Sequence, residues 1–106
     1  MASLHSLNRS IEPWARWLVS LAPYAGARSV RITSVRRTRA QQTRLWENYL
    51  AGRSLFPAAP PGASKHEYGL AWDMVTEPAE ALAVLGSWWR SVGGTWSPRD
   101  PIHFEV

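Results

Sequence analysis

Residues 64–73 read SKHEYGLAWD, a stretch that joins metal-capable side chains to a strand signal. The pattern of Leu70–Val75 predicts a β-strand whose side chains alternate between two faces. Asp73 lies in the middle of that strand between apolar neighbours, where a carboxylate needs a partner. His66 lies just upstream, and Gly69 permits a sharp turn that brings it towards the face of Asp73.

A second predicted strand, Ile102–Val106, shows the same combination at the end of the chain. Its apolar side chains share one face, and His103 and Glu105 share the other. Two strands therefore each present polar, metal-capable groups on one face.

Two imidazoles and one carboxylate suit a catalytic zinc ion, because such sites keep a fourth position open for water. A nearby carboxylate would carry the proton, and Asp100 and Glu105 are both candidates. The alternative is that these side chains are ordinary core or surface groups, as most His and Asp residues are.

The composition leaves few other choices of chemistry. The 106 residues are 45% hydrophobic and 19% charged, which is typical of one globular domain spanning residues 1–106. The absence of cysteine excludes disulfides, thiolate zinc sites and a cysteine nucleophile. With only two Asp and three His in the chain, a metal site must draw on a short list.

The net charge of +4 is unevenly distributed. Residues 1–53 hold nine Arg against two Glu, whereas residues 54–106 carry a net charge of −3. A basic half can attract nucleic acid, an anionic cell envelope or an acidic substrate, or it can simply be a solvated surface.

No uninterrupted apolar stretch is long enough for a membrane span. Residues 14–27 fit an amphipathic helix better than a signal peptide, so we expect synthesis in the cytoplasm without an export signal.

The remaining pattern predicts three helices and one further strand. A helix capped by Ser10 should begin at Ile11, a second should follow Thr38 to about Leu50, and a third should start at Thr76–Pro78. Ser29–Ser34 reads as a strand, and residues 54–65 as an irregular loop. The fold class is therefore α+β, a small antiparallel sheet with helices packed against it.

Each helix has an apolar stripe that we expect to face the core. The three stripes are Ile11, Trp14, Leu18 and Leu21; then Leu45, Trp46, Tyr49 and Leu50; and last Leu82, Leu85, Trp89 and Val92. Gln42 falls on the second stripe, where its amide is either a buried structural group or a substrate contact.

Three motifs resemble the zinc D-alanyl-D-alanine carboxypeptidase family, which includes the L-alanyl-D-glutamate endopeptidases of phage endolysins and shares the hedgehog fold. They are Ser64-x-His66-x-x-Gly69-x-Ala71-x-Asp73, Asp100-x-x-His103-Phe104-Glu105, and Ser34-Val-Arg-Arg-Thr38 followed by Gln42-x-x-Leu45-Trp46. Together they span residues 34–105.

The resemblance implies a role for each matched position. His66, Asp73 and His103 would bind zinc, and Asp100 would be the catalytic acid/base. Arg37 matches the arginine that steadies substrate oxygens. Arg36 is the alternative, because Val35-Arg36 replaces the Gly-Tyr that usually precedes this arginine. Ser64, Gln42 and Glu105 would contact the substrate or support the ligands, with Glu105 orienting a ligand histidine through its other ring nitrogen.

The function that the resemblance implies is hydrolysis of peptidoglycan stem peptides by a zinc peptidase. The enzyme would be an endopeptidase or a carboxypeptidase, monomeric, and active at the bacterial cell wall or periplasm, with phage-mediated release as one route there. Two alternatives are a nucleic-acid-binding module built on Arg28–Arg44 with Trp46, and a zinc-containing recognition domain without catalysis. We expect no nucleic-acid partner, because that alternative leaves the first two motifs unexplained.

Overall fold

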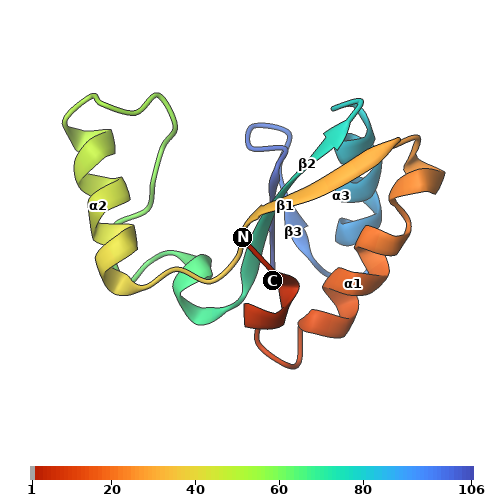
Figure 1. The fold of residues 1–106 in the computed structure, drawn as a ribbon, viewed down its shortest axis with the longest axis horizontal. Helices are drawn as coiled ribbons and strands as arrows, with labels where there is room; N and C mark the ends of the chain where they lie inside the picture. The colour runs from red at the N-terminus through yellow and green to blue at the C-terminus, as the bar shows by residue number, and fades with distance from the viewer. Residues whose placement is uncertain (1) are drawn as a thin grey trace.

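A computed structural model describes residues 2–106 as a four-stranded antiparallel sheet with three α-helices (Figure 1). The helices are α1 (Glu12–Ser20), α2 (Arg39–Leu50) and α3 (Ala81–Ser91). The strands are β1 (Ser29–Ser34), β2 (Ala71–Glu77), β3 (Thr95–Trp96) and β4 (His103–Glu105). Three short 3₁₀ turns join them: η1 (Leu4–Ser6), η2 (Ala22–Ala25) and η3 (Lys65–Tyr68).

The strand order β1-β2-β4-β3 puts β2 and β4 at the centre of the sheet. The predicted α+β class and antiparallel sheet are confirmed. Strand β3 was not predicted, because two residues are too few to show an alternating pattern. The third helix begins at Ala81 rather than next to Pro78, because β2 continues to Glu77.

The core lies between the sheet and the helices α1 and α3, and aromatic rings form its centre. Trp72 of β2 stacks on Phe104 of β4 with ring centroids 5.4 Å apart, and it meets Trp89 of α3 edge-on at 5.0 Å. Leu18 of α1 and Leu85 of α3 are fully buried beside them. Burying these large apolar surfaces is the main source of stability here.

Helix α1 differs from the prediction in two respects. Ile11, not Ser10, is its N-cap, and the Ser10 hydroxyl donates to Asn8 Oδ1 instead. Trp14 is half exposed, because the buried face of α1 is centred on Ala15 and Leu18. Among residues 2–106, no helix is long and apolar enough to cross a bilayer.

Helix α2 differs more from its prediction than α1 does. It begins as predicted, with Thr38 and Gln41 forming the capping box, but it stands apart from the sheet (Figure 1). Gln42 is its only buried residue, and the predicted inward stripe, including Leu45 and Leu50, is partly or largely exposed. Val92, at the end of the third predicted stripe, is also exposed. We call α2 with the following loop (residues 39–63) the α2 lobe.

Candidate metal centre

His66 is placed by the 3₁₀ turn η3. The Ser64 hydroxyl caps that turn by accepting from the His66 backbone N–H, and Gly69 ends it in the left-handed conformation with φ 68°. A non-glycine residue would be strained there. The His66 side chain is buried, and its Nδ1 lies 2.6 Å from the carbonyl oxygen of Val35. The turn therefore fixes the position of the ring, and the Val35 carbonyl fixes its orientation.

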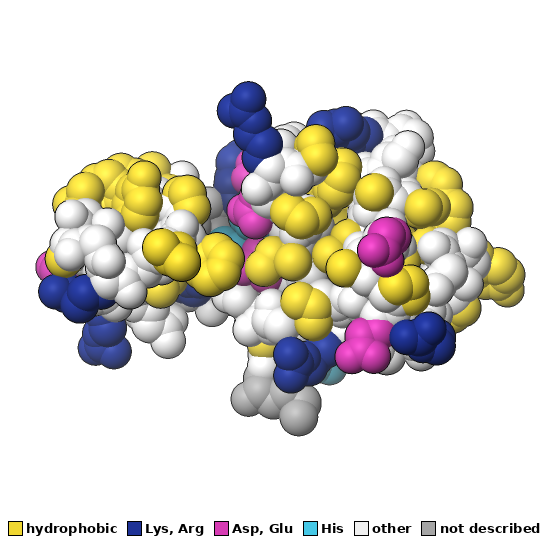
Figure 2. Space-filling view, turned by 90° about the horizontal axis from the view of Figure 1, so that it is seen from above, with side chains coloured by type: hydrophobic (Ala, Val, Ile, Leu, Met, Phe, Trp, Pro, Cys, Tyr) yellow, Lys and Arg dark blue, Asp and Glu magenta, His cyan; other side chains and the backbone are white. Residues whose placement is uncertain are grey.

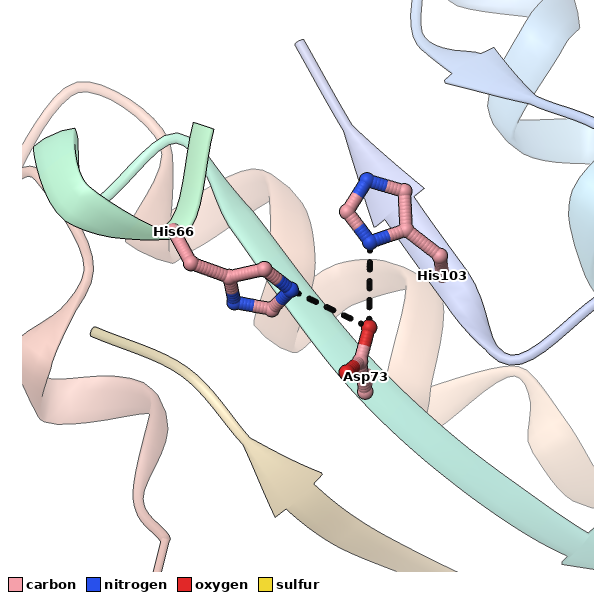
Figure 3. A group of neighbouring side chains, drawn as sticks. All are labelled: His66, Asp73 and His103. Carbon is pink, nitrogen blue, oxygen red and sulfur yellow. Dashed lines mark hydrogen bonds and ion pairs between the residues drawn. The ribbon is translucent and has the colours of Figure 1, made fainter. Parts of the chain in front are cut away.

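Asp73 and His103 are brought together by strand pairing. They lie directly opposite each other in the β2–β4 register. Asp73 Oδ1 is 3.0 Å from His103 Nδ1 and 3.2 Å from His66 Nε2, and both imidazoles point towards this carboxylate (Figure 3). One ligand atom from each of the three residues lies within 4.8 Å of the others. The three predicted zinc ligands thus form one cluster that could hold a metal ion.

Each imidazole faces oxygen atoms with both of its ring nitrogens. His66 faces Val35 and Asp73, and His103 faces Asp73 and, at 2.8 Å from Nε2, the Glu105 carboxylate. A neutral imidazole has one N–H and can donate to only one of two acceptors. A metal cation held by the inner nitrogens and Asp73 fits this arrangement, because the outer N–H groups still donate to Val35 and Glu105. The donor set also matches the ligands that zinc prefers.

The electrostatics of the cluster follow from this carboxylate between two rings. Burial by itself would raise the pKa of Asp73, but hydrogen bonds from His103 and His66 outweigh burial and hold the pKa far below its ordinary value. Burial would likewise lower the pKa of His103, but hydrogen bonds to Asp73 and Glu105 raise it. The site keeps Asp73 ionised and favours positive charge between the ligands.

Arg37 extends the cluster on the side of β1. Its guanidinium donates to Asp73 Oδ2 at 3.2 Å, to Gln42 Oε1 at 3.3 Å and to Ser34 Oγ at 3.2 Å. Arg36 points elsewhere, with its Nε donating to the Ser6 carbonyl. Of the two candidate arginines, the structure therefore brings Arg37 to the metal cluster and not Arg36.

Gln42 is held on both sides of its buried amide. Its oxygen accepts from Arg37, and its amino group donates to the Ala59 carbonyl at 2.8 Å. Of the two interpretations of this residue, the contacts support the buried structural one. Gln42 links Arg37 to the loop of the α2 lobe.

A cleft of about 560 Å³ opens over the cluster, between the α2 lobe and the sheet. Figure 2 shows this hollow, with histidine and acidic side chains visible inside it. Its lining includes all three metal-ligand candidates and most of the other predicted site residues, namely Arg37, Gln42, Ser64, Asp100 and Glu105. Asp100 is exposed in the cleft, and its backbone carbonyl accepts from the His103 N–H in the turn before β4.

Glu67 supports the site, but it was not among the site residues predicted from the motifs. Its almost fully buried carboxylate accepts from Arg39 Nε and from the backbone N–H groups of Gly62 and Ser64. Burial by itself raises the pKa of Glu67, but these hydrogen bonds outweigh it and lower the pKa. Glu67 therefore fastens the α2 lobe to η3, next to His66. The sequence signal available was its capping-box spacing from Ser64.

Comparison with solved structures places this fold among peptidases. A mutant of the vancomycin resistance D,D-pentapeptidase VanY in complex with Zn(II) matches with a TM-score of 0.73 and 20% identity, covering 94% of this chain and 72% of that one. VanYB in complex with D-alanine-D-alanine matches with a TM-score of 0.67 and 18% identity, covering 94% and 71%. The Serratia marcescens L-Ala D-Glu endopeptidase ChiX matches with a TM-score of 0.62 and 20% identity, covering 97% and 82%.

The chain therefore has the α+β fold of these peptidases, and the resemblance read from the motifs is confirmed for the fold. No family model matches the chain, and no curated protein matches it in sequence.

Proposed function

We propose that this chain is a zinc-dependent peptidase that hydrolyses peptidoglycan stem peptides at the bacterial cell wall. The observation that carries the proposal is the cluster of His66, Asp73 and His103 on the wall of an open cleft. Support comes from the shared fold, because similar structures include a Zn(II) complex, a D-alanine-D-alanine complex and an L-Ala D-Glu endopeptidase.

The ligands proposed for the zinc ion are His66 Nε2, His103 Nδ1 and the Asp73 carboxylate. When bound, zinc supplies a Lewis acid and lowers the pKa of its water to about 7. Val35 and Glu105 hold the outer nitrogens of the two imidazoles and so fix which nitrogens face the metal.

Two further side chains complete the proposed mechanism. The exposed Asp100 carboxylate in the cleft accepts a proton from the attacking water and returns it to the leaving amine. The Arg37 guanidinium, held by Ser34 and Gln42, presents positive charge where the oxyanion of the scissile carbonyl develops. The bond cut is either L-Ala-D-Glu, as in an endopeptidase, or the terminal D-Ala, as in a carboxypeptidase.

The test combines metal analysis with mass spectrometry of digested peptidoglycan. We expect one zinc ion per chain and one defined class of new peptide terminus. Asp100→Ala and the nearly isosteric Asp100→Asn should keep the zinc and lose hydrolysis. Glu47→Ala is the matched control, because Glu47 is an exposed acid on α2 away from the cleft lining.

The possible outcomes separate the proposal from its alternatives. Bound zinc with intact muropeptides would indicate a recognition domain without catalysis. Full activity of both Asp100 variants would remove Asp100 from the mechanism. Protein without zinc affinity would overturn the assignment of the three ligands.

A further inference from the structure

A second cavity of about 590 Å³ adjoins the cleft, on the side of the N-terminal residues. Arg37 and Leu45 line both hollows. The remaining walls come from η1 and its flanking residues, the end of β1, and a face of α2 that carries Gln41, Arg44 and Asn48. A ligand chain that leaves the cleft can therefore reach this cavity past Leu45.

The charge of the cavity is positive. Arg36, Arg37 and Arg44 line it, and no Asp or Glu is among its lining residues. Arg37 is paired with Asp73, but Arg36 and Arg44 take part in none of the ion pairs found within residues 2–106. At the rim, His5 lies 3.5 Å from Glu12. The guanidinium groups of Arg36 and Arg44, which have no acidic partner within residues 2–106, attract an anion, and their planar shape matches a carboxylate.

The two amide side chains of the cavity, Gln41 and Asn48, add donors rather than acceptors. The Gln41 side-chain oxygen already accepts from the Thr38 N–H, at 2.8 Å. The Asn48 side-chain oxygen accepts from Arg53 Nε, at 3.0 Å. Both amides therefore keep their amino groups available, which again favours an anionic ligand.

We propose that this cavity binds a free carboxylate of the peptide substrate, at a distance from the bond that is cut. The inference rests on the proposed function and narrows its substrate class to acidic stem peptides. A glutamyl residue uses one carboxyl group in the peptide chain and keeps the other free, so a glutamyl stem peptide carries the required group. Arg44 is the residue that recognises it, since its side chain makes no other hydrogen bond found in the structure.

The experiment compares two stem peptides, one with the free glutamyl carboxylate and one with the corresponding carboxamide. With zinc-loaded wild-type protein, we expect a lower KM for the carboxylate peptide. Arg44→Gln should raise that KM about tenfold, the size expected for losing a charge-assisted hydrogen bond, and leave kcat unchanged. The same variant should leave the KM of the carboxamide peptide unchanged. Arg31→Gln is the matched control, because Arg31 is exposed on β1 and lines neither hollow.

Calorimetric binding of both peptides to the protein separates failure of this inference from failure of the proposed function. If neither peptide is cut but the carboxylate peptide binds more tightly in an Arg44-dependent way, the cavity is supported and the peptidase proposal is wrong. If both peptides are cut and bound equally well, or if Arg44→Gln affects them equally, the carboxylate site is refuted.

Discussion

Glu105 is expected to control zinc affinity without touching the metal. Its carboxylate lies 2.8 Å from His103 Nε2, the ring nitrogen that faces away from the cluster. Removing such a partner of a ligand histidine typically weakens metal binding about 10–100-fold. Saturating zinc should therefore stabilise Glu105→Ala by about 1.4–2.7 kcal/mol less than it stabilises the wild type. Each tenfold loss of zinc affinity corresponds to about 1.4 kcal/mol. For a domain of this size, that lowers the Tm by about 5–20 °C.

The metal-free protein should respond much less to the same substitution. The His103 and Glu105 side chains are 22% and 26% exposed, so solvent screens their ion pair in part. A pair of this kind contributes about 0–1 kcal/mol. The Glu105 backbone carbonyl still accepts from Trp89 Nε1 after the substitution, so the packing of α3 on β4 is kept. The effect should therefore appear mainly with zinc present.

The assay is a zinc titration against a competing chelator, combined with thermal melts with and without zinc. Glu47→Ala serves as the control, because this glutamate is exposed on α2 and lines neither hollow. A zinc affinity of Glu105→Ala within about twofold of the wild type would refute the reasoning, which calls for at least a tenfold change. Equal losses of Tm with and without zinc would assign Glu105 a purely structural role.

Two further predictions concern packing and the attachment of the α2 lobe. A Cβ at Gly86 of α3 would overlap the indole ring of Trp96, so Gly86→Ala should lower the free energy of unfolding by about 1–3 kcal/mol in urea melts; an unchanged value would mean that the ring moves freely. Glu67→Gln removes the charge that holds Arg39. In limited proteolysis, the rate of cleavage within residues 54–63 should rise by a larger factor than the rate of global unfolding. An unchanged cleavage rate would contradict this attachment.

The sequence predicts the components of the site better than their arrangement. The alternation in residues 70–75 and 102–106 correctly separated the polar faces carrying Asp73 and His103 from the buried rings of Trp72 and Phe104. The register that sets Asp73 opposite His103 is not a local property, because it depends on how two distant strands pair. The contact of Val35 with His66 could not be predicted for a different reason. It supplies a backbone carbonyl, which any residue at that position has.

Periodicity failed at α2 because it reports which side chains share a face, and not whether another element covers that face. Leu45 and Tyr49 lie on the predicted stripe, yet each is 38% exposed. In α1 the same reasoning chose Leu18 correctly and Trp14 wrongly. A wide aromatic side chain fits the edge of a stripe as readily as its centre, and only tertiary packing distinguishes the two.

The two sides of the cleft are built on different physical principles. Asp73 and His103 come from β2 and β4, which rest on the aromatic core through Trp72 and Phe104. His66 comes from η3, and the Val35 carbonyl holds its ring. The α2 lobe buries only Gln42 of its helix and is fastened by polar contacts, chiefly that of Gln42 with Arg37 and those of Glu67 with Arg39 and Gly62. None of the three metal-ligand candidates lies on the α2 lobe, and the side chains of the lobe reach them through Gln42, which holds Arg37, and Arg39, which pairs with Glu67. The other side chains on this wall of the cleft can therefore change without disturbing the metal centre. The lobe is therefore where differences in substrate preference are most easily built, and the arginine-lined cavity beside it fits that role.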